Sequence, residues 1–385
     1  MSVTAAAGFR AAGIPAGIKT SGTLDLALVV NDGPSRVAAG VFTRNQVKAA
    51  PVLWSAQVLT GRRLRAVVLN SGGANACTGP GGFQDTHLTA ERVATVLDCG
   101  AIEVAVCSTG LIGERLPLQA VLSGVDTAAT ALAATPEAGL AAATAVLTTD
   151  TVPKQAAVAG AGWTVGGFAK GAGMTAPSLA TMLCVLTTDA AVGESTVDAA
   201  LRAASAETFE RLDIDGTCST NDSVLLLASG ASGVEPDGAE FAAAVQRVCH
   251  ELVKGLQSDA EGVTKEITIT VRGAADDVDA LAAARAVARD NLVKTAFFGS
   301  DPNWGRIAAA VGASPATVRA DALDIRLGGV LLCQGGVVVA DRSKADLSGR
   351  EITVEIDLHL GTAEATVLTT DLSPGYVEEN SAYSS

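Results

Sequence analysis

The chain has little positive charge, few histidines and no long apolar run. Its 385 residues include 27 Lys and Arg against 41 Asp and Glu, which gives a net charge of −14. This balance argues against a protein that binds nucleic acid or an anionic membrane, because both partners favour a basic surface. It does not exclude an anionic substrate, since one nearby lysine can outweigh a distant negative field.

Signals for membrane insertion and export are also missing. No run of about 18 apolar residues occurs, so no transmembrane helix is predicted. Residues 1–10 lack a basic head followed by an unbroken apolar core, so no signal peptide is predicted. We therefore expect a cytoplasmic protein.

The few histidines and the spacing of the cysteines limit the possible chemistry. Only His87, His250 and His359 are present, and no Gly-x-Ser-x-Gly elbow exists to pair with them, which disfavours a Ser-His-Asp hydrolase. The seven cysteines include no Cys-x-x-Cys pair, so we expect buried thiols and neither a disulfide scaffold nor a structural zinc site. Lys170 follows a glycine stretch but precedes no Ser or Thr of a Walker motif, which disfavours nucleotide binding.

Apolar residues, by contrast, are abundant. They make up 48% of the chain against 18% charged residues, so a large core is expected, in several domains or in one large sandwich. Apolar, β-branched runs predict strands at 24–30, 66–70, 103–107, 181–186, 224–228, 266–271, 337–340, 351–358 and 365–368. Polar and apolar residues alternate in the strand at 351–358, which predicts that one of its faces is exposed to water. Helical periodicity appears at 89–97, 197–211, 239–257 and 278–289, with an alanine-rich helix at 128–146 that Pro136 and Gly139 interrupt. The lack of a strict βαβ rhythm favours α+β layers.

Turn-forming residues suggest local structure between these elements. Residues 70–75 and 78–82 are expected to form one glycine-dense loop. Ser300 or Asn303 is expected to cap a helix over 307–311.

The stretch from Lys170 to Leu183 is arranged as a site of chain cleavage. A flexible glycine segment leads to Ala180, and Thr181 then opens an apolar run. If the Ala180–Thr181 bond breaks, Thr181 gains an α-amine beside its hydroxyl, and the amine can act as the general base for that hydroxyl. An α-amine with a pKa of about 7.7–8 is partly unprotonated near neutral pH. Taken alone, the stretch also fits a glycine-rich loop that enters a buried strand.

Several motifs in order along the chain carry a family resemblance. Lys170–Leu183 resembles the processing site of the arginine-biosynthesis ornithine acetyltransferase family, also called the glutamate N-acetyltransferase or ArgJ family. Thr175 and Ser178 stand where that family has a larger apolar residue and an Asn or Asp. The other matching segments are Ser108–Gly113, Thr148–Thr151, Ser219–Asp222, Ser258–Gly262, Gly299–Arg306 and Asn380–Ser385.

The resemblance implies a fold and a processing event. The implied fold is an α+β layered sandwich of the N-terminal-nucleophile-like (DmpA/ArgJ-like) type, with mixed sheets covered by helices. The chain would cleave itself between Ala180 and Thr181, giving an α chain of residues 1–180 and a β chain of residues 181–385 in one interwoven body. The family assembles as two copies of each chain, so a heterotetramer is expected.

The resemblance also implies the site residues. Thr181 would be the nucleophile, and Thr109 and Gly110 would form the oxyanion hole, in which preplaced donors stabilise the charge on the attacked carbonyl. Lys170 suits a substrate carboxylate, while Glu261 or the terminal carboxylate suits an ammonium group. Taken without the resemblance, Lys170 is an ordinary loop lysine, Glu261 a loop carboxylate and 380–385 a frayed tail. The residues that match the family's substrate contacts are Thr148, Lys170, Thr181, Glu261, Asn380 and Ser385.

The implied reaction moves an acetyl group from N2-acetyl-L-ornithine to L-glutamate through an acetyl-Thr181 intermediate. No metal or organic cofactor is implied. Some family members also use acetyl-CoA as donor, and the sequence leaves open which kind this chain is, or whether it serves specialised metabolism. Two alternatives remain: an N-terminal-nucleophile amidase or aminopeptidase that passes the acyl group to water, and an uncut binding protein.

Overall fold

The computed structural model describes residues 2–176 and 182–382, which form two compact units. The first unit comprises Met1–Glu210 and Thr217–Leu256, and the second comprises Arg211–Gly216 and Gln257–Ser385. The predicted cleavage point, Ala180/Thr181, lies outside the described residues. The segments before and after it both belong to the first unit, so the units do not coincide with the two chains expected from the sequence.

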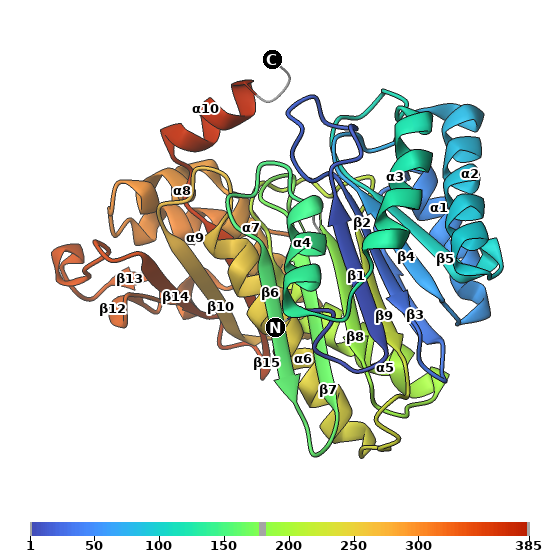
Figure 1. Cartoon of the computed structure of the whole chain (residues 1–385). Helices are drawn as coiled ribbons and strands as arrows, with labels where there is room; N and C mark the ends of the chain where they lie inside the picture. Colours follow the sequence, from blue (N-terminus) through green and yellow to red (C-terminus); the bar gives the residue numbers. More distant parts are fainter. Residues whose placement is uncertain (1, 177–181, 383–385) are drawn as a thin grey trace. The chain divides into compact units, whose positions relative to one another are not determined.

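Two sheets form the centre of the first unit (Figure 1). One has the order β1–β2–β4–β5, and the other has the order β3–β9–β8–β7–β6. β4 and β5 are parallel, as are β8 and β9, and the remaining neighbours are antiparallel. The strands are β1 (Phe9–Ile14), β2 (Leu26–Asn31), β3 (Val37–Phe42), β4 (Ala66–Asn70), β5 (Val104–Ser108), β6 (Lys154–Ala159), β7 (Thr164–Lys170), β8 (Leu183–Thr188) and β9 (Ser223–Ala228).

The inner strands are apolar on both faces because each sheet is covered on both sides. All residues of β2, β4, β5, β8 and β9 are buried, as expected for strands with no wet face. Side chains from both sheets, such as Leu28 and Val68 of one and Val185 and Leu225 of the other, form one continuous core. This core anchors the strand ends that carry the candidate site.

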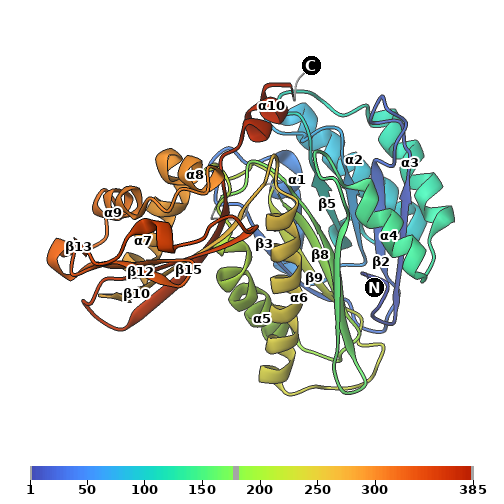
Figure 2. The same cartoon turned by 90° about the vertical axis from the view of Figure 1, so that its left-hand side faces the viewer.

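Helices cover the outer faces of the two sheets (Figure 2). α1 and α2 contact β5, α3 and α4 contact β1 and β2, and α5 contacts β3. α6 packs through Phe241 against Trp163 in the turn between β6 and β7, with a ring-centroid distance of 5.9 Å. The helices are α1 (Ala50–Val58), α2 (Gly79–Leu97), α3 (Leu118–Ala131), α4 (Pro136–Ala145), α5 (Glu194–Glu207) and α6 (Gly238–Ser258), whose last two residues belong to the second unit.

Two sequence predictions in this unit need correction. Residues 79–82 are not a loop but the first turn of α2, since Pro80 lies where helix N–H groups have no intrahelical partner. The stretch 128–146 is interrupted before Pro136 as predicted and forms parts of two helices, α3 and α4, but Gly139 does not interrupt α4. Thr135 caps the second one by accepting a hydrogen bond from Ala138 N, and Pro136 begins it.

The second unit is a six-stranded sheet with helices α7 to α9 packed on it. Its order is β13–β12–β11–β14–β10–β15, in which β10 and β14 are parallel. Ile352, Val354 and Ile356 of β14 are buried, while Glu351 and Thr353 are exposed, which confirms the predicted strand with one wet face. The strands are β10 (Glu266–Ala274), β11 (Asp324–Leu327), β12 (Val330–Gln334), β13 (Val337–Val338), β14 (Glu351–Asp357) and β15 (Ala363–Thr370).

The helices of this unit begin at defined caps. Asn303 accepts a hydrogen bond from Arg306 N and caps α9, which confirms the predicted cap and extends the predicted helix by one turn. The helices are α7 (Asp277–Arg289), α8 (Asn291–Phe298), α9 (Trp304–Gly312) and α10 (Pro374–Ala382). Short 3₁₀ turns lie at Leu59–Gly61, Ala101–Glu103, Phe209–Arg211, Ala320–Ala322 and Arg342–Lys344.

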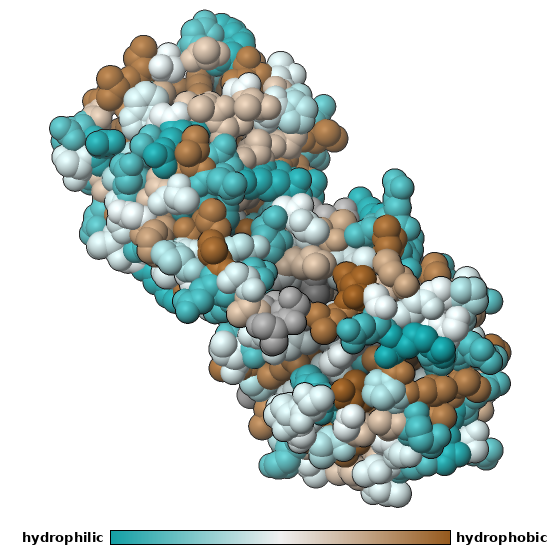
Figure 3. Space-filling model, turned by 90° about the horizontal axis from the view of Figure 1, so that it is seen from above, coloured by the Kyte–Doolittle hydropathy of each residue, from teal (hydrophilic) through white to brown (hydrophobic). Residues whose placement is uncertain are grey.

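Mixed sheets covered by helices confirm the predicted α+β layers. None of the helices described is long and apolar enough to cross a membrane. All seven cysteines are free thiols, of which Cys107, Cys184, Cys249 and Cys333 are buried and Cys77 is exposed. On the face seen in Figure 3, hydrophilic residues are interspersed with small apolar groups.

Candidate active site

The turn after β5 is held by the neighbouring strand and by a glycine loop. Thr109 N donates to Asn70 O (3.0 Å), and Gly73 N donates to Thr109 O (3.0 Å). Ser108 Oγ donates to Asn70 Oδ1 (2.6 Å), and Asn221 Nδ2 donates to Ser108 O (2.9 Å). Hydrogen bonds therefore fix both the N–H and the C=O group of Thr109.

Gly110 occupies a position that only glycine fits. Its φ is +133°, and an added Cβ would lie 2.4 Å from the backbone nitrogen of Gly73. Within the described parts of the chain, the Gly110 N–H donates no hydrogen bond. An N–H that is held in place but unused is what an oxyanion hole requires.

Lys170, the last residue of β7, is buried with an exposed fraction of 1%. Its ammonium donates to Thr148 Oγ1 (2.8 Å) and Thr109 Oγ1 (3.4 Å), and it pairs with Asp150 Oδ2 at 3.5 Å. Two hydroxyl acceptors and one carboxylate therefore hold the ammonium in place. Lys170 is thus no solvated loop lysine. Because the Thr109 hydroxyl accepts from Lys170, its own proton remains available to donate.

Asp150 is the carboxylate at the centre of this cluster. Its Oδ1 accepts from Lys154 Nζ and from Gly171 N, both at 2.6 Å, and its Oδ2 accepts from Thr148 N at 3.1 Å. Burial would raise the pKa of the Asp150 carboxyl, but the charges of Lys170 and Lys154 outweigh burial and hold this pKa well below its usual range. The ionised carboxylate therefore keeps Lys170 and Thr148 in place beside Thr109.

A second buried carboxyl, Asp222, lies at the entry to β8. Its Oδ1 accepts a hydrogen bond from Met182 N at 3.0 Å. Burial raises the pKa of the Asp222 carboxyl well above its usual range.

Ala180, Thr181 and Ser385 lie outside the described residues, so their predicted roles stay predictions. The residues that flank the predicted cleavage point are well anchored, however. β7 and β8 are antiparallel neighbours, with Lys170 opposite Leu183, and Met182 is buried. Lys170 and Met182 are therefore held at the same end of one pair of strands.

Glu261 and Asn380 are brought together in the second unit. Asn380 Nδ2 donates to Glu261 Oε2 (2.8 Å) and to Tyr376 O (3.0 Å). Asn380 belongs to α10, so the alternative of a frayed tail is wrong for this residue. Of the predicted site residues, the structure thus gathers Thr109, Gly110, Thr148 and Lys170 in one cluster, and Glu261 with Asn380 in another.

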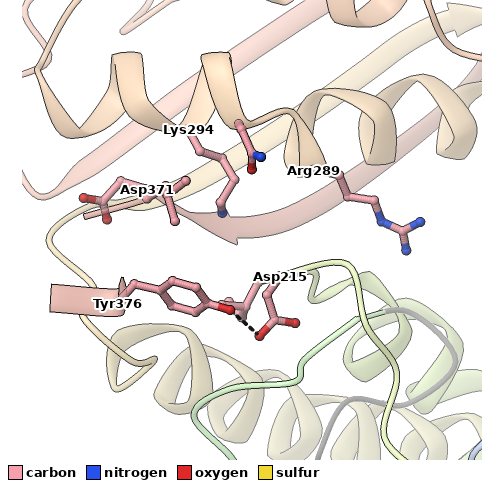
Figure 4. A pocket seen from close by; sticks show the side chains of 8 residues that line it. Asp215, Arg289, Lys294, Asp371 and Tyr376 are labelled. Carbon is pink, nitrogen blue, oxygen red and sulfur yellow. Dashed lines mark hydrogen bonds between the residues drawn. The ribbon is translucent and has the colours of Figure 1, made fainter. Parts of the chain in front are cut away.

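A small polar cavity of ≈ 90 Å³ lies beside Tyr376 in the second unit. In Figure 4, Lys294 extends from α8 toward the space above Tyr376, and the Tyr376 hydroxyl donates to Asp215 Oδ2 at 3.3 Å. Lys294 Nζ donates to Thr369 Oγ1 (3.0 Å) and to Thr370 O. Burial lowers the pKa of the Lys294 ammonium to about 8, against the opposing charges of nearby aspartates.

Comparison with known proteins identifies the family. The model of the ArgJ family matches residues 10–385. The chain belongs to the ArgJ family. This ArgJ-family chain is 64% identical over 389 residues to the arginine biosynthesis bifunctional protein ArgJ of Mycolicibacterium paratuberculosis, covering 100% of the chain and 96% of the relative. It is 57% identical over 384 residues to the protein of that name from Thermobifida fusca, with 100% of each covered.

A solved relative is the ornithine acetyltransferase of Mycobacterium tuberculosis, complexed with ornithine. It is 65% identical to the ArgJ-family chain, with a TM-score of 0.45, and the match covers 46% of this chain and 94% of that chain. Family membership confirms the resemblance read from the motifs. The mixed sheets covered by helices agree with the layered α+β fold that this resemblance implied.

Sequence reasoning missed several polar residues that build the ArgJ-family site. Asp150 lies inside the matching segment Thr148–Thr151, and Asn221 and Asp222 lie inside Ser219–Asp222, yet no role was predicted for any of them. The sequence offered one signal for such roles, namely that these residues lie in segments that match the family. Their roles depend on partners distant in the chain, as with Asn221, which bonds to Ser108 across 113 residues.

Proposed function

We propose that this chain is an N-acetyltransferase of arginine biosynthesis, which moves the acetyl group of N2-acetyl-L-ornithine to L-glutamate. Its relatives are named arginine biosynthesis bifunctional proteins, and a solved relative is named an ornithine acetyltransferase. The observation that carries the proposal is the Thr109–Gly110 turn. There, the Gly110 N–H, which has no acceptor among the described residues, and the adjacent Thr109 hydroxyl are held at the strand end beside Lys170.

The first step we propose is self-cleavage between Ala180 and Thr181. Thr181 Oγ attacks the Ala180 carbonyl carbon, the C–N bond breaks, and the acyl group moves from nitrogen to oxygen. Water then hydrolyses the ester and releases residues 1–180 and 181–385. The pairing of β7 with β8 supports this step, because the hydrogen bonds between the two strands would hold both chains together after the cut.

Acetyl transfer would then follow in two halves. Thr181 Oγ attacks the acetyl carbonyl of acetylornithine, and its proton passes through the α-amine to the departing ornithine nitrogen. Glutamate attacks the acetyl-Thr181 ester and leaves as N-acetylglutamate, so ping-pong kinetics are expected. The Gly110 N–H and the Thr109 hydroxyl would stabilise the oxyanion in both halves.

Substrate recognition would use the residues that match the substrate contacts of the family. Glu261, held by Asn380 Nδ2, suits the side-chain ammonium of ornithine, and the Ser385 carboxylate is a second candidate. Thr148 and Lys170 would lie near the substrate's carboxylate. Since the Lys170 ammonium is engaged by Thr148, Thr109 and Asp150, its main effect would be to orient these groups. We keep the expected assembly of two α and two β chains as part of the proposal.

Thr181→Ala tests the proposal directly. This variant should remain one uncut polypeptide and form no acetyl-enzyme, as measured by intact mass with and without acetylornithine. Thr60→Ala, an exposed threonine on a 3₁₀ turn, is the matched control and should be cut like the wild type. Recovery of two fragments from Thr181→Ala would contradict the proposal, and an uncut wild type that is active would do so as well.

The acetyl acceptor and donor are tested on the cut enzyme. Release of ornithine from acetylornithine should depend on glutamate, and release at the same rate into water would favour the amidase alternative. A comparison of acetylornithine with acetyl-CoA at fixed glutamate would decide whether the chain also uses the second donor.

A further inference from the structure

Lys19 is a second lysine beside the Thr109–Gly110 turn, and the mechanism above leaves it unused. A cation is needed for the α-carboxylate of the substrate, because acetylornithine and glutamate both carry this group. Lys170 is poorly suited to the task, since two hydroxyls and the Asp150 carboxylate already hold its ammonium. A substrate carboxylate bound to Lys170 would have to displace one of these protein acceptors.

The buried carboxyl of Asp25 fixes the backbone that carries Lys19. Asp25 lies directly before β2 and has an exposed fraction of 0%. Its Oδ1 accepts from Ala16 N at 2.6 Å, and its Oδ2 accepts from Ile18 N at 2.7 Å and from Lys19 N at 2.8 Å. These bonds hold residues 16–19 in place, although the segment belongs to no helix or strand. The core therefore sets the position of the Lys19 backbone.

The Lys19 side chain runs along the glycine loop that holds the oxyanion turn. An added Cβ on Gly72 would lie 3.1 Å from Lys19 Cγ, so the lysine stem packs directly on this glycine. The residue after Gly72 donates its N–H to Thr109 O. The Lys19 ammonium donates to Leu147 O at 2.7 Å, directly before Thr148 in the chain. Lys19 thus connects the two loops that carry Thr109 and Thr148.

The Lys19 ammonium still has donors to offer. Two of its N–H groups have no acceptor among the residues that the structure describes, and the side chain is partly exposed there. Burial lowers the pKa of this ammonium and the charge of Lys170 lowers it further, while the charges of Asp25 and Asp150 oppose both effects. An anion bound at Lys19 would relieve the repulsion between the two lysines.

Charge balance supports a site for one anion. Lys19 is linked, directly or through Asp150, to two further lysines and two carboxylates, by ion pairs or by their effect on its pKa. The five groups are Lys19, Lys154, Lys170, Asp25 and Asp150. Three cations against two anions leave one positive charge, which a single substrate carboxylate would neutralise.

We propose that Lys19 binds the α-carboxylate of the amino-acid substrates through the two N–H groups that Leu147 does not use. This inference rests on the proposed function, and it names the residue that recognises the end common to acetylornithine and glutamate. Lys170 then orients Thr109 and Thr148, while Lys19 contacts the substrate. The binding step forms no covalent bond and transfers no proton.

Lys19→Met tests this contact, because methionine keeps much of the stem and loses the charge. The two substrates are N2-acetylornithine and its α-carboxamide, in which a neutral amide replaces the carboxylate. For the wild type, kcat/KM should be about 10- to 100-fold higher for the acid than for the amide, the effect of a hydrogen bond to a charged group. In Lys19→Met this ratio should fall to roughly 1–3. A purely structural role would lower both kcat/KM values equally, and an unchanged ratio would overturn the inference.

Two further variants control for folding and for net charge. Each ratio compares two substrates on one enzyme, so a smaller folded or cut fraction cancels. Lys19→Arg keeps the charge and should retain most of the preference for the acid. Lys48→Met is the matched control, since Lys48 is an exposed lysine of the first unit, and its ratio should equal that of the wild type. If Lys48→Met loses the preference as fully as Lys19→Met, net charge sets the ratio and the inference is wrong.

Calorimetry separates failure of this inference from failure of the proposed function. Ornithine carries the α-carboxylate but no acetyl group, so its binding requires no turnover. Wild-type protein should bind ornithine about 10- to 100-fold more tightly than Lys19→Met does. Equal affinities, or no binding of ornithine to the wild type, would overturn the role of Lys19 whether or not acetyl transfer occurs. Wild-type protein that binds ornithine through Lys19 but releases none from acetylornithine would contradict the proposed function alone.

Discussion

Lys170 in the first unit and Lys294 in the second are both buried lysines, but their partners differ. Lys170 touches a carboxylate, Asp150, and two hydroxyls. Lys294 donates to the hydroxyl of Thr369 and the carbonyl of Thr370, which are neutral oxygens. The pKa of the carboxyl is held low in the first case, and the pKa of the ammonium is lowered in the second.

This difference indicates how each buried lysine and its partners would respond to a mutation or to a shift in pH. A buried ion pair in contact loses much of its stability when one partner is removed, because the other charge remains buried. A buried ammonium among neutral oxygens is instead sensitive to pH, since it can lose its proton to relieve burial. The first arrangement suits a site that must keep a fixed geometry.

The largest expected effect comes from Lys170→Met. It leaves the Asp150 charge buried with fewer partners, so the free energy of unfolding should fall by about 3–5 kcal/mol. Ornithine release should also be lost, because the Thr109 hydroxyl is no longer oriented. Urea unfolding and turnover measure both, with Lys294→Met as the matched control. If both variants lose the same free energy of unfolding, the ion pair with Asp150 does not distinguish Lys170 from Lys294.

Gly110→Ala should have the next largest effect. The added Cβ clashes with Gly73 N, and φ of +133° is strained for alanine, so the Gly110 N–H would move. We expect turnover to fall by about 100- to 1,000-fold, the usual result of losing one oxyanion donor.

Gly262→Ala is its counterpart in the second unit. There, an added Cβ would lie 2.0 Å from Tyr376 N and displace α10, which carries Asn380. This variant should mainly raise KM, roughly tenfold, as for one lost hydrogen bond. Suppose that Gly262→Ala lowers kcat as strongly as Gly110→Ala. The assignment of Gly110 to the chemical step, and of Glu261 and Asn380 to substrate binding, is then wrong.

Stability against pH should single out Lys294. The ordinary lysine pKa of 10.5 is lowered to about 8 in the folded state. Between these values the unfolded chain binds more protons, so the free energy of unfolding rises with pH. Relative to Lys294→Met, the wild type should gain on the order of 3 kcal/mol from pH 8 to 10.5, measured by urea unfolding. If the difference in the free energy of unfolding between the wild type and Lys294→Met does not change over this pH range, Lys294 keeps its proton throughout.

The smallest effect is expected from helix caps, one in each unit. Asp290 caps α8, which carries Lys294, by accepting from Val293 N at 2.9 Å, and Thr135 caps α4 in the first unit. Replacement of either by alanine should lower the free energy of unfolding by about 1 kcal/mol. Neither replacement should reduce turnover by more than a few-fold. A large loss of turnover in Asp290→Ala would indicate that the cavity beside Lys294 takes part in catalysis.

Local pattern predicted a good part of the fold. The strand over 66–70 lies where the apolar run placed it, the alternation of 351–357 identified its wet face, and Asn303 caps α9 as expected. Each of these features depends on neighbours within a few residues. The prediction failed at 79–82, where glycines that resemble a loop form a helical turn. Gly82 packs there so closely on Asn75 and Thr78 that a side chain would not fit.

The sequence by itself determined the family, because ordered motifs from Ser108 to Asn380 carry that information without any contact between them. It also predicted many of the strands and helices, since periodicity is a local property. It did not predict β1, β3, β6 or β7, whose runs are short or rich in alanine and glycine. Only the tertiary structure decided that Lys170 is buried and engaged by Thr109, 61 residues away, and that the buried Asp222 carboxyl accepts the Met182 N–H, 40 residues away. These facts arise from burial and long-range pairing, which no local pattern encodes.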